Sequence, residues 1–174
     1  MKDPVFEGVA TAIVTPFNQG TIDFPVMNRL LDLQLAAGVD AIVVCGTTGE
    51  AATLSYNERM ALIERCVRTA DRRVPVIAGS GTNSTASSIA LSKAAQSAGV
   101  DALLTVTPYY NKASQSGLVQ HFSAIADAVD VPVILYNVPA RTGIGCTVQT
   151  YQALAKHPNI VGVKEASDNF DLIQ

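Results

Sequence analysis

The sequence predicts an α/β protein whose strands form a (β/α)8 TIM barrel, and three observations lead to that prediction. Short apolar runs rich in Val, Ile or Leu alternate with amphipathic stretches, at a spacing of roughly thirty residues that is typical of βα units. Ala37–Ala41 recurs as Ala98–Ala102, and Val74–Ile77 recurs as Val131–Ile134, which indicates a repeat of two βα units. Polar residues gather directly after the apolar runs, as in barrels whose strands all end on one face.

The predicted strands are the apolar runs themselves. They start near Val9, Asp40, Val74, Asp101, Val131 and Asn159. The stretches between them predict helices with recognisable ends. Ser55 and Glu58 have the spacing of a capping box, while Gly38 and Gly99 directly follow two other predicted helices. The predicted helices span Pro25–Ala37, Ser55–Ala70, Asn83–Ala98, Ser114–Val129 and Thr147–Lys156.

Six strands are fewer than a closed barrel contains. A (β/α)8 barrel has eight strands and typically about 250 residues, whereas this chain has 174. We therefore expect one domain over residues 1–174 with only about the first six βα units, truncated before the last two strands. Unpaired strand edges would make such a chain an unstable, inactive monomer on its own. A doubly wound open sheet is the alternative architecture.

Composition excludes several classes of function. Apolar residues make up 48% and charged residues 16%, as in a compact globular protein. The net charge of −3 and the lack of a basic run argue against nucleic acid as a partner. No apolar stretch is long enough to span a membrane, and Val9–Val14 is too short for a signal-peptide core, so we expect a cytoplasmic protein. The cysteines Cys45, Cys66 and Cys146 match no metal-site spacing and suit reduced thiols.

Five polar segments follow the ends of the second to sixth predicted strands. They are Gly46–Glu50, Gly79–Asn83, Thr107–Asn111, Tyr136–Gly143 and Lys164. In a parallel barrel the C-terminal ends of all strands open on the same face, where active sites lie. We therefore expect these segments to converge around one pocket.

Lys164 is the candidate nucleophile. It ends the apolar run within Val161–Ala166, which has the composition of a strand buried on both faces. Burial would disfavour the ammonium form, and the neutral amine can attack a carbonyl group to form a Schiff base. For a lone lysine, an ordinary exposed charge is the commoner interpretation. The four other polar segments favour the nucleophile instead.

Each of those other segments also has a purely structural interpretation. The glycines of Gly46–Glu50 and Gly79–Gly81 can serve simple turns. Gly79–Gly81 also hints at phosphate binding before a helix, although it lacks the GxGxxG pattern and the Walker lysine. Tyr110 and Tyr136 can be packing aromatics with a wet hydroxyl, and Arg141 can be a solvated loop charge.

Four motifs together resemble one family. Gly46–Glu50, Tyr109–Asn111, Tyr136–Thr142 and Gly162–Ala166 occur in this order at appropriate distances. From about Phe6 to its last residue, the chain is similar to the dihydrodipicolinate synthase (4-hydroxy-tetrahydrodipicolinate synthase) family of pyruvate-dependent class I aldolases. The two threonines of the first motif and the arginine of the third favour this family over its relatives, N-acetylneuraminate lyase and the keto-sugar-acid aldolases.

The resemblance implies a lyase that condenses pyruvate with L-aspartate 4-semialdehyde in lysine and diaminopimelate biosynthesis. Lys164 would form an imine with the pyruvate ketone, and the derived enamine would add to the aldehyde without any metal or organic cofactor. Tyr136 would shuttle protons near the imine, in a relay with Thr47 and Tyr110.

The resemblance also implies how the substrates and subunits are held. The hydroxyls of Thr47 and Thr48 suit the pyruvate carboxylate, and Arg141 offers a planar fork to the carboxylate of the second substrate. In the family, the tyrosine that matches Tyr110 comes from a neighbouring subunit, which implies a homo-oligomer, a dimer or a tetramer.

The chain departs from the lysine-inhibited members of the family near the start of the helix after the third strand. Those members carry an acidic residue there, whereas this chain retains Asn83 but has Ser87 at the acidic position. Tyr56 and Arg59 also stand where inhibited members often carry histidines. We therefore expect weak or absent inhibition by lysine.

Three hypotheses stay open from the sequence. The first is the synthase, and the second is a relative that uses the same Schiff-base chemistry on another aldehyde. The third is a truncated, inactive chain that acts only as a folding or assembly module.

Overall fold

In the computed structural model, which describes residues 4–172, six strands form one parallel sheet. In order across the sheet they are β1 (Ala10–Ala12), β4 (Ala41–Val44), β5 (Val76–Gly79), β6 (Ala102–Val106), β7 (Val133–Asn137) and β8 (Ile160–Glu165). Strands β1 and β8 are its two edges, and within the described residues no strand lies between them. The predicted incomplete (β/α)8 barrel is confirmed.

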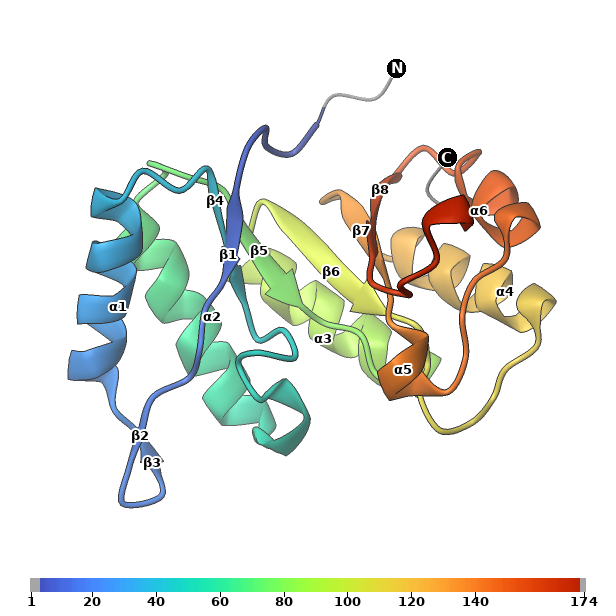
Figure 1. Cartoon of the computed structure of the whole chain (residues 1–174). Coiled ribbons are helices and arrows are strands. Elements are labelled where there is room, and N and C mark those ends of the chain that lie inside the picture. Colours follow the sequence, from blue (N-terminus) through green and yellow to red (C-terminus); the bar gives the residue numbers. More distant parts are fainter. Residues whose placement is uncertain (1–3, 173–174) are drawn as a thin grey trace.

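The helices wrap around the outer face of this sheet (Figure 1). They are α1 (Phe24–Ala36), α2 (Tyr56–Ala70), α3 (Thr85–Ser97), α4 (Gln115–Ala126) and α6 (Val148–Leu154). All five were predicted, and the expected capping box of α2 is present: Ser55 Oγ accepts from the Glu58 N–H, and the Ser55 N–H donates to Glu58. Within residues 4–172, none of the helices combines the length and apolarity that a membrane span needs.

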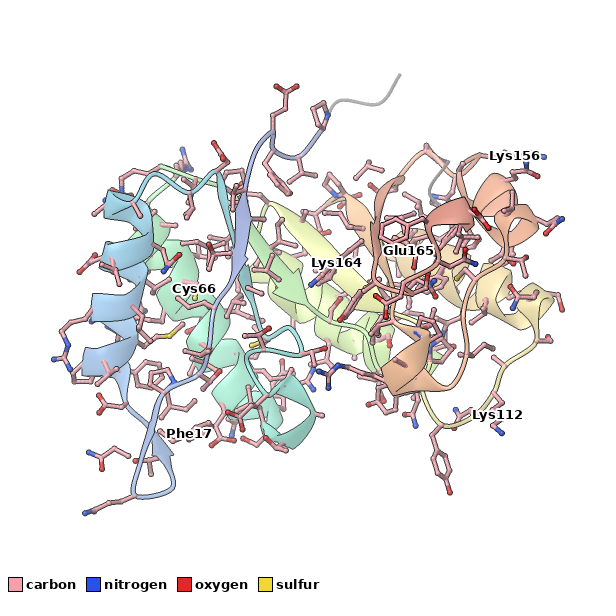
Figure 2. The ribbon with its side chains drawn as sticks, in the orientation of Figure 1. Phe17, Cys66, Lys112, Lys156, Lys164 and Glu165 are labelled. Atoms are coloured by element: carbon pink, nitrogen blue, oxygen red, sulfur yellow. The ribbon has the colours of Figure 1, made fainter. Side chains whose placement is uncertain are left out.

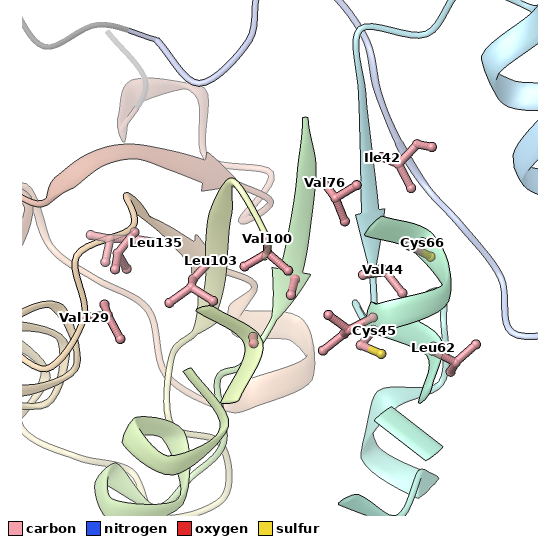
Figure 3. Packing of buried hydrophobic residues seen from close by; sticks show 14 of the residues in the cluster. Ile42, Val44, Cys45, Leu62, Cys66, Val76, Val100, Leu103, Val129 and Leu135 are labelled. Carbon is pink, nitrogen blue, oxygen red and sulfur yellow. The ribbon is translucent and has the colours of Figure 1, made fainter. Parts of the chain in front are cut away.

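The main core lies between the helices and the sheet. Alternate residues of a strand point to opposite faces, so Ile42 and Val44 of β4 pack against the helices whereas Val43 faces the interior of the open barrel. Figure 3 shows residues of this helix-side core, among them Val44 on β4 and Leu62 on α2. A smaller inner cluster lies on the opposite face of the sheet. Its buried members are Ala41, Val43, Ile77, Ala102, Leu104, Tyr136 and Val138.

The repeated Ala-Gly-Val-Asp-Ala motif has the same structural task in both copies. The carboxylate of Asp40 accepts the Val9 N–H at 2.7 Å, and that of Asp101 accepts the Val76 N–H at 2.8 Å. Each aspartate thus satisfies a backbone donor at the N-terminal end of the neighbouring strand. The glycines before them, Gly38 and Gly99, adopt φ of +76° and +90°, where a side chain would be strained.

Several short elements were not predicted. They are the strands β2 (Phe17–Asn18) and β3 (Thr21–Ile22), the helix α5 (Pro139–Thr142), and the 3-10 helices η1 (Ala51–Thr53) and η2 (Phe170–Leu172). Strands β2 and β3 form a small antiparallel hairpin. Helix α5 corrects the expectation that Arg141 lies in a loop: Pro139 starts a helical turn, and Gly143 ends it at φ +75°.

Strand β8 corrects a second expectation. The run that contains Lys164 was predicted to be buried on both faces, but within residues 4–172 β8 is a sheet edge that pairs only with β7. Val163 is therefore 43% exposed, and Lys164 is exposed as well. A strand's apolar composition does not bury it when one neighbouring strand is absent from the sheet.

Candidate active site

A cavity of about 820 Å³ opens where strands β4 to β7 end. It is lined by residues from all four polar segments that follow these strands, among them Thr47, Gly81, Tyr110, Tyr136 and Arg141. The volume lies in the range that small-molecule sites occupy, which is about 300–1,000 Å³. The predicted convergence of five segments on one pocket is thus confirmed for these four, whereas Lys164 does not line this cavity.

Lys164 reaches this region from the adjacent strand. Tyr136 and Lys164 are register partners on β7 and β8, and the Lys164 Nζ lies 4.6 Å from the centroid of the Tyr136 ring. The Tyr136 side chain is 7% exposed and belongs to the inner cluster. Lys164, which Figure 2 labels, lines a second cavity together with Val43 of the inner face and Phe6 of the N-terminal segment. A cation over an aromatic face is attracted by the ring quadrupole, so this contact orients the amine.

The two threonines of the first motif have different positions. Both are exposed, but Thr47 lines the large cavity whereas Thr48 lines neither of the two cavities described here. Within residues 4–172, no hydrogen bond joins the Tyr136 hydroxyl to Thr47. The relay from Tyr136 through Thr47 therefore stays a prediction.

Tyr110 and Arg141 stand on segments that are tied together. The Tyr110 N–H donates to the Thr142 carbonyl oxygen at 3.2 Å, and the Thr107 hydroxyl donates to the Thr142 hydroxyl at 3.1 Å. Tyr110 is 88% exposed and has a φ of +72°, a backbone conformation that costs on the order of 1 kcal/mol or more for a non-glycine residue. Thr142 was not predicted to be this link, although it ends the third motif.

The paired glycines after β5 serve close packing. A Cβ atom at Gly79 would lie 2.0 Å from the Cys45 carbonyl oxygen, and one at Gly81 would lie 2.4 Å from the Val106 nitrogen. Only glycine permits these approaches between neighbouring strand ends. The structural interpretation of Gly79–Gly81 accounts for both residues without a phosphate.

The cysteines pack as protonated thiols. Burial raises the pKa of Cys45 to about 12, although the nearby Arg59 guanidinium acts in the opposite direction, and burial raises the pKa of Cys66 and Cys146 to about 12 as well. All three are buried free cysteines. Within residues 4–172, no group of three or more His, Cys, Asp or Glu side chains lies close enough to hold a metal ion.

A hydrogen-bonded group on the helix side of β8 was not predicted. Glu165 accepts from Asn137 Nδ2 at 2.9 and 3.0 Å and from the Tyr151 hydroxyl at 2.5 Å (Figure 2 labels Glu165). Burial acts to raise the pKa of Glu165, but hydrogen bonds from Tyr151, Ser167 and Asn137 outweigh burial and hold that pKa below its ordinary value. Burial, together with the bond to Glu165, raises the pKa of Tyr151, so its hydroxyl stays a donor. No local sequence signal links these positions.

Comparison with known proteins shows which family the chain matches. The chain matches the model of the dihydrodipicolinate synthetase family over residues 5–174. It is 54% identical to the 4-hydroxy-tetrahydrodipicolinate synthase of Geobacter metallireducens over 163 residues, which cover 94% of this chain and 56% of that protein. The chain thus spans little more than half the length of the curated relatives it matches.

Solved structures give the same result. Dihydrodipicolinate synthase from Aquifex aeolicus is similar to this chain with a TM-score of 0.94 and 43% identity, over 97% of this chain and 58% of that one. Dihydrodipicolinate synthase from Acinetobacter baumannii, complexed with pyruvate, has a TM-score of 0.93 and 48% identity, over 95% of this chain and 57% of that one. Both therefore share the architecture described above.

Proposed function

Because the chain belongs to the dihydrodipicolinate synthetase family, we propose that it provides the Schiff-base site for condensing pyruvate with L-aspartate 4-semialdehyde to 4-hydroxy-tetrahydrodipicolinate. One observation carries the proposal: the Lys164 Nζ lies over the Tyr136 ring, 4.6 Å from its centroid. Tyr136 itself lines the large cavity, together with Thr47, Tyr110 and Arg141. An amine, a phenol and a guanidinium at one strand-end opening suit imine chemistry on a keto acid.

The first half of the reaction makes a carbon nucleophile. The neutral amine of Lys164 attacks the ketone carbon of pyruvate, and the carbinolamine loses water to give an imine. The Tyr136 hydroxyl donates the proton that leaves with this water. Loss of a proton from the pyruvate methyl group then gives an enamine. No metal or organic cofactor takes part in the proposed sequence.

The second half joins the two substrates. The enamine carbon attacks the aldehyde carbon of L-aspartate 4-semialdehyde, and the aldehyde oxygen takes up a proton. The amino group of the adduct then attacks the imine carbon, which closes the ring and releases the Lys164 amine. Arg141 holds the carboxylate of the second substrate in a bidentate pair, while Thr47 and Thr48 hold the pyruvate carboxylate. For Thr48, which is exposed and lines neither cavity, this role requires a movement of its loop.

The proposal includes a homo-oligomer, a dimer or a tetramer. Tyr110 is 88% exposed at the rim of the cavity, on a segment that hydrogen bonds fix to α5. A large aromatic side chain held outward in this way can enter the site of a neighbouring subunit. In the assembly, the relay at Tyr136 and Thr47 would be completed by the partner's tyrosine.

Borohydride reduction in the presence of pyruvate tests the proposal. The imine should be reduced to a stable secondary amine, and mass spectrometry should locate it on the peptide that contains Lys164. Absence of an adduct, or an adduct on another lysine, would overturn the assignment. With the trapped lysine identified, consumption of aspartate semialdehyde in preference to sugar-derived aldehydes should place the chain with the synthases rather than with the related aldolases.

A further inference from the structure

Strand β8 contains an extra residue in its pairing with β7. Val133 pairs with Ile160, but the next residue of β7, Ile134, pairs with Gly162. Val161 therefore has no partner, which is the arrangement of a β-bulge. From this point onward the pairing is shifted by one residue.

The shift decides which face of the sheet Lys164 occupies. In the observed pairing, Tyr136 lies opposite Lys164 and both face the cavities, while Asn137 lies opposite Glu165 on the helix side. Pairing without the extra residue would continue from Val133 and Ile160, and would set Tyr136 opposite Val163 and Asn137 opposite Lys164. Because a one-residue slip turns every side chain of a strand to the other face, Lys164 would then point to the helices.

Little in the sheet itself fixes the register of β8. Within residues 4–172 the strand pairs on one side only, with β7, and of its six residues only Ile160 is buried. An edge strand with so little buried apolar surface is weakly specified and prone to slip. The register therefore has to be fixed by side chains beyond the ladder.

Three side chains on the helix side fulfil that requirement. Asn137 Nδ2 donates to both carboxylate oxygens of Glu165, at 2.9 and 3.0 Å, and the Tyr151 hydroxyl of α6 donates to Glu165 Oε2 at 2.5 Å. Asn137 is itself fixed, since its Oδ1 accepts the Cys146 N–H at 3.1 Å. These bonds need Glu165 directly beside Asn137, so they form in the bulged register and are lost in the slipped one.

We propose that Asn137, Glu165 and Tyr151 form a register lock that holds β8 in its bulged pairing and keeps Lys164 over Tyr136. The three are positioning residues, which act on the amine through the backbone of β8. The lock itself rests on the pairing and the hydrogen bonds, while its importance for catalysis rests on the proposed function of Lys164.

The lock has a spectroscopic signature. Protons of the Lys164 side chain above the Tyr136 ring should be shifted upfield by the ring current, relative to those of Lys93, Lys112 and Lys156. Glu165→Gln places an amide NH2 group against that of Asn137, and it should abolish this upfield shift. In the same variant, trapping of pyruvate on Lys164 should slow by roughly 10²-fold, as expected for a reacting group that is displaced by an ångström or more.

A double variant should restore the lock. In Asn137→Asp/Glu165→Gln the donor and acceptor exchange places: the new amide donates to the new carboxylate and still accepts from Tyr151. The second carboxylate oxygen at position 137 still accepts the Cys146 N–H. Both the upfield shift and the trapping rate should recover, which a merely stabilising role of Glu165 does not predict.

Further variants complete the test. Glu64→Gln removes the same charge from an exposed position on α2 and should change neither readout. Tyr151→Phe removes one donor and should cause a smaller change in the same direction, and it decides the question if Glu165→Gln fails to fold.

An unchanged upfield shift in Glu165→Gln, or no recovery in the double variant, would overturn the lock. A wild-type chain that shows the shift but traps no pyruvate would overturn the proposed function instead, and leave the lock to be judged by the shift alone.

Discussion

The two faces of the sheet differ in what covers them. The helix side carries a continuous core in which Leu103, Leu118 and Phe122 are fully buried. The inner side carries a small cluster, two cavities and the exposed amine of Lys164. The same strands supply both faces, because alternate residues point in opposite directions.

This difference separates stability from chemistry. Apolar area removed from water contributes roughly 25 cal/mol per Å², so the covered helix side supplies most of the folding free energy. The inner side keeps its polar groups accessible to a substrate. Substitutions on the inner face should therefore affect trapping of pyruvate, while substitutions on the helix side should affect unfolding.

Replacing the nucleophile should have the largest effect. Lys164→Ala should abolish borohydride trapping of pyruvate, because no other amine lies over the Tyr136 ring among residues 4–172. Its melting temperature should stay close to that of the wild type, since Lys164 is exposed and surface substitutions change stability by only about 0.5 kcal/mol or less. If Lys164→Ala still trapped pyruvate on Lys93, Lys112 or Lys156, the assignment of the chemistry to the inner face would be wrong.

Removing the Tyr136 hydroxyl should have the next largest effect. Tyr136→Phe keeps the buried ring and so should keep the fold, but it should lower the rate of imine formation by roughly 10²–10⁴-fold, the usual contribution of a positioned proton-transfer group. Stopped-flow or quenched trapping would measure that rate. Tyr56→Phe, at an exposed position that starts α2, is the matched control. An unchanged rate in Tyr136→Phe would favour a pure packing role.

The helix side should show the opposite behaviour. Leu103→Ala removes a fully buried side chain of β6 and should lower the free energy of unfolding by about 2–5 kcal/mol, whereas trapping at a temperature where the variant is folded should be nearly normal. Val163→Ala on β8, at a position 43% exposed, should cost about 0.5 kcal/mol or less. Denaturant titration would compare the two. If the two variants lost equal amounts of unfolding free energy, Val163 would be more deeply buried in the folded protein than its place on an edge strand indicates.

The same contrast explains what the sequence could predict. The helices and the starts of the six sheet strands were predicted to within one to three residues, since local signals such as the capping box of Ser55 and Glu58 are satisfied within their own segment. The hairpin of β2 and β3 was missed because strands of two residues carry no periodicity. Helix α5 was missed although Pro139 and Gly143 mark its ends.

The site was predicted in part for the same reason. Five polar segments were expected to converge because strand ends share one face of the sheet, and four of them do converge on the large cavity, whereas Lys164 lines the second one. The burial expected for Lys164 depends on strands on both sides of β8, which no local pattern reports, and in the described part of the chain β8 has only one neighbour. The bonds from Asn137 and Tyr151 to Glu165 depend equally on long-range packing.

A buried histidine should make the stability of the helix side depend on pH. His121 is 6% exposed, its Nδ1 lies 2.8 Å from the Thr85 hydroxyl, and its Nε2 is buried without a hydrogen-bond partner. Burial lowers the pKa of His121 below its ordinary value of 6.5. The unfolded state therefore binds a proton first, so stability should be full above that value and should decrease as the pH falls below it, until the folded protein is also protonated.

Melting temperatures measured from pH 7.5 to pH 5 test this dependence. Glu58 and Glu165, whose pKa values lie below 4.5, lose their contributions at lower pH and do not interfere in this window. His121→Gln should flatten the profile, while His157→Gln is the matched control at the other histidine. If the melting temperature of His121→Gln still changed with pH as it does in the wild type, a group other than His121 would titrate between pH 7.5 and pH 5.

The smallest expected effect is that of free L-lysine. Ser87 lies exposed in the first turn of α3, where its N–H donates to Ser84 Oγ at 3.3 Å. A serine hydroxyl can share a neutral hydrogen bond with an ammonium group but cannot neutralise its charge, and charge-assisted hydrogen bonds are about twice as strong as neutral ones. Sub-millimolar lysine should therefore leave the rate of pyruvate trapping unchanged. Ser87→Glu should introduce sensitivity to lysine, because the other residues of that turn, Thr85, Ala86 and Ser88, carry no charge. Inhibition of the wild-type chain at sub-millimolar lysine would show that another acidic group binds it.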